Sequence, residues 1–155
     1  MLKSIEGNFD NHKVNELLIK HFVELRAASP EGSAHVLDIP GLKIPSIKFW
    51  SLWNKEKLIG CGALKFLDKE HGEFKSIRIH DDFRKQGKGI NVINHLINEA
   101  KKLKIKRLSI ETGASDFFIP ARKLFKKTGF TVCEPFAHYK KDINSVYLTM
   151  HISNI

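Results

Sequence analysis

The sequence predicts an α+β domain built on one mixed sheet that is mostly antiparallel. Three strand-like segments joined by short polar turns precede residue 81, and a strand, a helix and a strand follow one another over residues 73–112. The length of 155 residues suits one domain with one sizeable core. A strand–helix–strand unit implies a parallel pair with a right-handed crossover. We therefore expect a single domain over residues 1–155, with one parallel pair in the middle of its sheet.

The first predicted element is an amphipathic helix over residues 11–28. Apolar residues recur there at helical spacing from Val14 to Leu25, and Pro30 and Gly32 end the pattern. The proline-punctuated segment 31–45 predicts a loop with a short helical turn. A loop of this length in a compact domain is often functional.

Three strands are predicted next, at residues 47–53, 58–67 and 73–80, because these stretches are rich in β-branched and aromatic residues. A turn at residues 54–56 makes the first two a hairpin. Period-2 alternation in the third strand predicts two faces, with Phe74, Ser76 and Arg78 on one and Lys75, Ile77 and Ile79 on the other.

The second half of the chain is predicted to hold two helices and three short strands. A helix over residues 88–103 leads to a strand over 107–112. Ser115 or Asp116 can cap the next helix, Pro120 suits its first turn, and Gly129 suits its C′ position. Two strands, at residues 130–133 and 146–151, close the chain.

Composition narrows the class of protein. The formal net charge of +9 makes a polyanionic partner plausible: nucleic acid, an anionic membrane surface or a ligand with several phosphates. The apolar runs are too short to span a bilayer, and residues 1–10 lack the apolar core of a signal peptide, so we expect a cytoplasmic protein. Two cysteines fit a reducing compartment, and the scattered histidines predict no metal site.

The most informative segment is the six residues from Arg84 to Gly89, between the third strand and the helix that follows it. Two glycines let the backbone approach a ligand closely, and the first-turn N–H groups of a helix carry partial positive charge. Cationic side chains surround both features. This combination predicts a site for a phosphate or pyrophosphate.

The Arg-x-x-Gly-x-Gly loop and the order of elements resemble the GNAT superfamily of N-acetyltransferases. The likeness to a bacterial subgroup of that superfamily covers nearly the whole chain. The segments that carry it are HFVELRAASPEGSAHVLDI (21–39), GCGALKFL (60–67), GEFKSIRIH (72–80), LSIETGASDFFIPAR (108–122), PARKLFKKTGF (120–130) and CEPFAHYKKDINSVYLTM (133–150).

The resemblance implies a GNAT-like acyl-CoA N-acyltransferase fold whose central parallel pair splays apart to admit acetyl-CoA as co-substrate. It implies direct transfer of the acetyl group to an amine in a ternary complex. The pantetheine arm would pair with the backbone of the third strand, and the pyrophosphate would lie on the loop and helix N-terminus. The residues implied to bind the cofactor are Ile77, Arg78, Ile79, Arg84, Lys85, Gln86, Gly87, Lys88, Gly89 and Ile90.

Catalysis of acetyl transfer needs a base for the ammonium of the acceptor. Glu73 on the third strand is the first candidate; the alternative is a solvated strand-end carboxylate beside Lys75. Glu111, at the end of the strand beside the splay, is the second; the alternative is that it caps the turn at residues 113–115. Many GNAT members carry a Leu-Tyr pair that supplies the acid, but here the pair is Leu124-Phe125, which leaves Tyr139 as the candidate.

The acceptor is expected to be a small-molecule amine or a peptide. Residues 29–47 and 134–145 are expected to shape its binding site. We expect no nucleic-acid or membrane partner. Two other functions stay open: a basic nucleic-acid-binding module, and a GNAT-like domain that senses CoA without turnover. The sequence also leaves a homodimer open.

Overall fold

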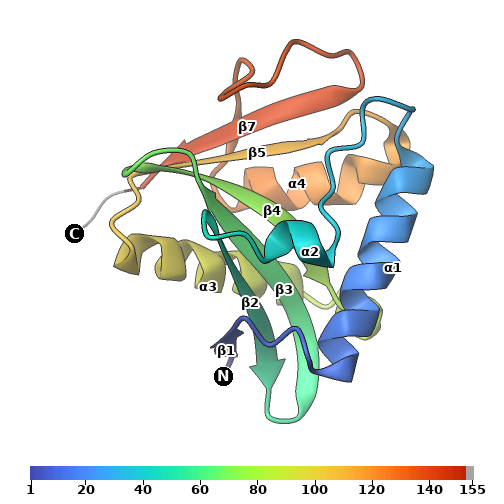
Figure 1. Ribbon diagram of the computed structural model, residues 1–155, viewed down its shortest axis with the longest axis vertical. Coiled ribbons are helices and arrows are strands. Elements are labelled where there is room, and N and C mark those ends of the chain that lie inside the picture. Colours follow the sequence, from blue (N-terminus) through green and yellow to red (C-terminus); the bar gives the residue numbers. More distant parts are fainter. Residues whose placement is uncertain (153–155) are drawn as a thin grey trace.

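Seven strands form one sheet in the order β1-β2-β3-β4-β5-β7-β6 (Figure 1). The computed structural model describes residues 1–152; residues 153–155 of the expected domain lie outside the described part. The strands are β1 (Lys3–Glu6), β2 (Ile47–Asn54), β3 (Lys57–Phe66), β4 (His71–Ile79), β5 (Arg107–Gly113), β6 (Thr131–Val132) and β7 (Ser145–His151). The helices are α1 (His12–Ala28), α2 (Ile39–Leu42), α3 (Lys88–Lys102) and α4 (Ile119–Lys127).

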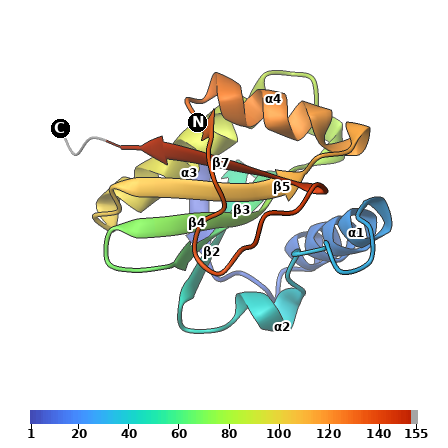
Figure 2. The ribbon, with the colours of Figure 1, turned by 90° about the horizontal axis from the view of Figure 1, so that it is seen from above.

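Helices cover both faces of this sheet. Figure 2 shows α1 and α2 on one face and α3 and α4 on the other. Each face has its own apolar core. Leu96 of α3 and Phe125 of α4 belong to the first core, while Leu17 of α1 and Leu42 of α2 belong to the second. The mixed α+β architecture predicted from the sequence is confirmed.

The local signals explain why α1 forms where predicted. The side chain of Asn11 caps the helix by accepting hydrogen bonds from the N–H groups of Lys13 and Val14, at 2.9 and 3.3 Å. The apolar stripe that begins at Val14 is buried against the sheet. Burying a Val or Leu side chain contributes about 1.5–3 kcal/mol, so this face stabilises α1 far more than helix propensity does.

Three features depart from the sequence-based expectations. Strand β1 was not predicted, because three of its four residues are polar and most are exposed, so hydrophobic alternation gives no signal there. The strand expected over residues 130–133 is reduced to the two residues of β6. The strict alternation expected in β4 is wrong, because the strand contains a bulge described below.

Among the strands of residues 1–152, the one parallel pair is β4 with β5. Helix α3 connects these strands, as the strand–helix–strand pattern predicted. Within residues 1–152, no helix has the length and apolar character required to cross a membrane.

Candidate active site

The parallel pair β4–β5 holds together for only three residue pairs. It joins His71 to Arg107, Gly72 to Leu108 and Glu73 to Ser109. Strand β4 then runs on to Ile79 and β5 to Gly113, and the two strands diverge (Figure 1). The result is a V-shaped opening between the carboxyl ends of parallel strands, with Glu73 at its vertex. Such an opening is a common place for a ligand in α/β sheets.

A bulge interrupts β4 just past this vertex. Cys61 of β3 lies opposite Arg78 and Ala63 opposite Lys75, so two steps on β3 match three on β4. The extra residue is Ser76, whose φ is +53°. After the bulge, Ile77 and Ile79 pack in the same apolar core as Phe74, the core on the face covered by α3 and α4. The predicted alternation had placed them on the opposite face from Phe74.

The segment Arg84–Gly89 forms the predicted strand-to-helix loop. Lys85 has φ +62°, and Gly87 has φ +75° as the N-cap of α3. The Gly87 cap makes no side-chain hydrogen bond to the helix, so the first-turn N–H groups of α3 are left for an external partner. Lys85, Gln86 and Gly87 are exposed. The loop therefore offers backbone donors, the positive end of a helix dipole and lysine charge to an anion.

A network of ion pairs that the sequence did not reveal joins the start of this loop to α1 and to the end of β4. The guanidinium of Arg78 is buried and donates to Glu24 of α1 at 2.7 Å and to Asp81 at 3.0 Å. Asp81 also pairs with Lys20 and with Arg84. The hydrogen bond from Lys20, with the charges of Arg78 and Arg84, lowers the pKa of Asp81 to about 2. Because the side chain of Arg78 faces α1, only its backbone is placed to meet a ligand in the V.

Glu73 is buried at the vertex of the V, with an exposed fraction of 1%. Its Oε2 accepts a hydrogen bond from the hydroxyl of Tyr139 at 2.6 Å, and the ammonium of Lys75 lies 3.3 Å away. Lys75 also donates to the Tyr139 hydroxyl at 3.2 Å. Oε1 of Glu73 is buried and has no hydrogen-bond partner among the described residues. The alternative of a solvated strand-end carboxylate is wrong, although the pairing with Lys75 is present.

The environment of Tyr139 keeps its hydroxyl protonated. Burial, and then the nearby charge of Glu73, raise the pKa of Tyr139. Tyr139 lies in the connection between β6 and β7, residues 133–144, as the sequence predicted. It is therefore a permanent hydrogen-bond donor to Glu73 at neutral pH.

Glu111 lies on β5, on the same side of the sheet as Glu73, but it is held by a different partner. Its Oε2 accepts a hydrogen bond from the Ser145 hydroxyl at 2.7 Å. It does not cap the turn at residues 113–115, where Arg122 instead donates to the carbonyls of Gly113 and Ser115. Burial raises the pKa of Glu111, and the charge of Glu73 adds to that rise.

Two connections meet over Glu73 and Glu111: residues 29–46 between α1 and β2, and residues 133–144. The Ser33 hydroxyl donates to Asp142 at 2.8 Å, and Asn144 donates to Ser33 at 3.4 Å. The rings of His35 and Tyr139 meet edge to face, with centroids 5.1 Å apart. The sequence singled out both segments but gave no sign that these residues join them.

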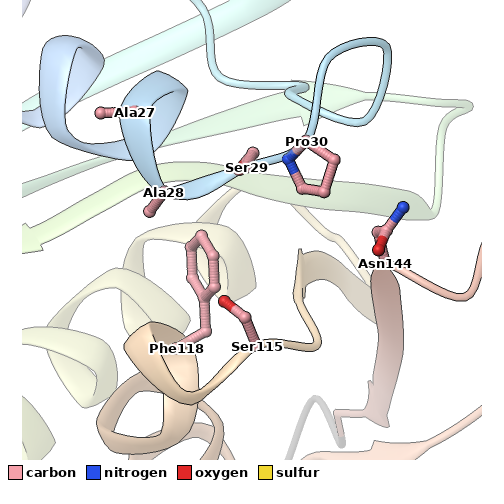
Figure 3. A pocket seen from close by; sticks show the side chains of 7 residues that line it. All are labelled: Ala27, Ala28, Ser29, Pro30, Ser115, Phe118 and Asn144. Carbon is pink, nitrogen blue, oxygen red and sulfur yellow. The ribbon is translucent and has the colours of Figure 1, made fainter.

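An open pocket of about 290 Å³ lies next to these two connections (Figure 3). The last two residues of α1 and the two that follow them (residues 27–30) form one wall, Ser115 and Phe118 after β5 form another, and Asn144 completes it. Ser29, Pro30 and Asn144 belong to the segments that the sequence predicted to shape an acceptor site.

Comparison with known proteins identifies the family. The model of the acetyltransferase (GNAT) family matches residues 13–130. This chain belongs to the GNAT acetyltransferase family. It is 45% identical over 137 residues to the N-acetyltransferase YsnE of Bacillus subtilis (strain 168), covering 88% of this chain and 91% of YsnE. It is 39% identical over 137 residues to the N-acetyltransferase YedL of Escherichia coli (strain K12), covering 88% and 86%.

Solved structures agree with the fold. A GNAT family acetyltransferase from Elizabethkingia anophelis, solved with acetyl-CoA bound, superposes with a TM-score of 0.69 at 22% identity, covering 97% of this chain and 98% of that one. The predicted GNAT fold and membership of an acyltransferase family are thus confirmed.

In this GNAT chain the position of Phe125 offers no acid group. Phe125 is buried in the core and meets Phe130 edge to face, with ring centroids 6.1 Å apart. Tyr147 is buried in β7 and its hydroxyl donates to the carbonyl of Lys140 at 2.7 Å. Of the two tyrosine hydroxyls, the Tyr139 hydroxyl is the one that donates a hydrogen bond to a candidate catalytic carboxylate, Glu73, within the described residues.

Proposed function

We propose that the protein binds acetyl-CoA in the V between β4 and β5 and transfers the acetyl group directly to a primary amine. The observation that carries this proposal is the buried Glu73 at the vertex of the V, with one carboxylate oxygen held by Tyr139 and Lys75 and the other free to accept a proton.

The loop Arg84–Gly89 supports the placement of the cofactor. A pyrophosphate on the first-turn N–H groups of α3 would satisfy donors that no side chain caps within residues 1–152, and Lys85 would add charge. The pantetheine arm would then run along β4 past Ile77, Arg78 and Ile79. Acetyl-CoA bound to a structural relative of the same fold is consistent with this placement.

Glu73 would act as the general base. An alkyl ammonium is mostly protonated at neutral pH, so Glu73 Oε1 takes one proton and leaves a free amine. The amine nitrogen attacks the thioester carbonyl carbon, and the C–S bond breaks. The products are the acetamide and CoA, and the second amine proton goes to the thiolate or to solvent. Glu111, held by Ser145, stays a candidate for relaying a proton.

Tyr139 would orient the carboxylate of Glu73 by its hydrogen bond, and would not be the general acid that protonates the leaving thiolate. Its raised pKa makes it a weak proton donor toward a thiolate, because an ordinary thiol has a pKa of only about 8.5. Its hydroxyl also already donates to Glu73. A thiolate leaves readily enough for the reaction to proceed without a dedicated acid.

The two cysteines support direct transfer over an acyl-cysteine intermediate. Burial raises the pKa of the Cys61 thiol to about 12, and its sulfur donates to the backbone of β4 at 3.4 Å. Burial also raises the pKa of Cys133. Neither thiol is activated for nucleophilic attack at neutral pH.

Calorimetric titration with acetyl-CoA, followed by thiol release with a panel of amines, tests this function. Saturable micromolar binding and amine-dependent thiol release would support it. Saturable binding without thiol release for any amine would indicate a CoA sensor. Salt-sensitive binding of a short DNA duplex without acetyl-CoA binding would contradict it.

A further inference from the structure

Lys75 is a largely buried cation with a single carboxylate partner among the described residues. Its side chain is only 10% exposed, and its ammonium lies 3.3 Å from Glu73 Oε2. It also donates to the Tyr139 hydroxyl at 3.2 Å. A lysine ammonium has three N–H donors, and within residues 1–152 its side chain makes these two hydrogen bonds only. One N–H of a poorly hydrated cation is therefore left without a partner.

The carboxylate partner of Lys75 is also the proposed base. When Glu73 takes a proton from the ammonium of an acceptor, it becomes neutral, and the Lys75 ammonium loses the one ion pair that it makes within the described residues. A buried ammonium without a counter-charge is unfavourable, because water screens its charge poorly. Proton transfer from a plain amine to Glu73 is therefore opposed by the charge of Lys75.

Glu111, the other candidate carboxylate on this side of the sheet, does not replace Glu73 as the partner of Lys75. Its Oε2 accepts a hydrogen bond from Ser145, and within residues 1–152 no ion pair joins it to Lys75. Burial raises the pKa of Glu111, which disfavours the ionised form that would balance a cation. The acceptor itself can supply the missing negative charge.

A carboxylate next to the amine of the acceptor would fill both open positions of this group. Its oxygens can accept the unused N–H of Lys75, while the ammonium donates to the free Oε1 of Glu73. One small molecule can reach both positions, because the charged atoms of Glu73 and Lys75 lie 3.3 Å apart. A zwitterion also leaves the net charge of this ion pair unchanged when it binds.

Resting on the proposed function, we infer that the acceptor is an α-amino acid whose carboxylate binds Lys75 while its amine reacts at Glu73. The chemical step is unchanged: the ammonium loses a proton to Glu73 Oε1, the N–C bond forms and the C–S bond breaks. Throughout this step an ionised carboxylate, that of the acceptor, stays beside the Lys75 ammonium. Lys75 is thus a specificity-determining residue.

The inference is tested by comparing kcat/KM for the standard amino acids with kcat/KM for their own amides. Each amide keeps the side chain and the α-amine but lacks the negative charge. Its amine is also less basic, so a simple need for free amine would favour the amide. We expect the best amino acid to be preferred at least tenfold over its amide.

An amide that reacts as well as the best amino acid, or better, contradicts the inference. So does a protein that binds acetyl-CoA and acetylates simple amines but no amino acid, a result that would leave the proposed function standing. Absence of acetyl-CoA binding would instead count against the proposed function.

Removing the charge of Lys75 tests its role separately from that of Glu73. Lys75→Met keeps the length of the side chain and should abolish the preference for amino acid over amide, while the Kd of acetyl-CoA stays within twofold, which also shows that the variant folds. Because the measured value is a ratio of two acceptors, a general change in the strength of the base cancels. Lys140→Met removes an exposed charge from the connection 133–144 and should keep the preference. A Lys75→Met variant that keeps the preference as well would overturn the inference.

Discussion

The hydroxyl of Tyr139 lies 2.6 Å from Oε2 of Glu73, although 66 residues separate the two in the sequence. This hydrogen bond ties the connection 133–144 to the vertex of the V. It also leaves the other oxygen of a buried carboxylate free. A residue from the connection between β6 and β7 thereby fixes the orientation of the group that we propose as the base.

Tyr139→Phe keeps the aromatic packing against His35 but removes the hydroxyl. A hydrogen bond to a charged group contributes about 1.5–3 kcal/mol, so we expect kcat to fall about 10- to 100-fold. Initial rates of thiol release measure this. The matched control is Tyr147→Phe, whose hydroxyl contacts a backbone carbonyl, and which should change kcat less than threefold. A loss far beyond a thousandfold in Tyr139→Phe would indicate an essential acid instead.

Gly87→Val should weaken acetyl-CoA tenfold or more. A Cβ at this position meets no atom within 4 Å, so the effect comes from the left-handed φ of +75° and from blocking the loop surface. Gly7 has φ +83° with equally open surroundings, outside the loop, so Gly7→Val carries the same backbone strain of about 1–3 kcal/mol. Calorimetry should show a changed Kd of acetyl-CoA for Gly87→Val only. Equal Kd values in both variants would indicate that the pyrophosphate does not bind at this loop.

Glu111→Gln should be at least as stable as the wild type at pH 7. Burial raises the pKa of Glu111 in the folded chain above its ordinary 4.5, so the folded state binds the proton more readily than the unfolded state. Stability therefore falls as pH rises from about 4.5 through the raised pKa. Glutamine removes that loss. Urea midpoints at pH 4 and pH 7, with exposed Glu134→Gln as control, check this; a Glu111→Gln variant that loses more stability at pH 7 than at pH 4 would refute it.

His21 should make folding sensitive to acid. It is buried on α1, and burial together with the charges of Arg78 and Arg84 lowers its pKa from 6.5 to about 3. Below pH 6.5 the unfolded state gains a proton that the folded state does not, so stability is lost as pH falls from 6.5 toward 3, by up to about 1.4 kcal/mol per pH unit. His21→Gln should flatten this slope in denaturant titrations. Exposed His12→Gln should leave it unchanged, and equal slopes in all three proteins would argue against the buried neutral histidine.

Much of the fold could be predicted because its signals are local. The apolar stripe from Val14, Gly87 at the start of α3 and Pro120 in the first turn of α4 each act within one or two turns of chain. The bulge at Ser76 could not be predicted in this way. It depends on the register of β4 against β3, where Gly60 lets the strands approach: a Cβ there would lie 2.5 Å from the Arg78 carbonyl oxygen.

In the candidate site too, the features made by neighbouring residues could be predicted, and the contacts between distant residues could not. The loop at Arg84–Gly89 is contiguous, so its composition alone predicts an anion site. The contacts of Arg78 with Glu24, and of Ser33 with Asp142, join residues 54 and 109 positions apart. No pattern in a single sequence marks such pairs. Glu73 and Tyr139 were each proposed from the sequence, but their hydrogen bond became visible only in three dimensions.

The most direct test of the central claim is the pH dependence of thiol release by Glu73→Gln with a reactive amine. Glutamine keeps the size and one acceptor oxygen but cannot take a proton. We predict a fall in kcat of about 10²- to 10⁴-fold at pH 7, with an unchanged Kd for acetyl-CoA, and a deficit that shrinks as pH approaches the pKa of the amine. A kcat at pH 7 within threefold of the wild type would show that Glu73 is not the base.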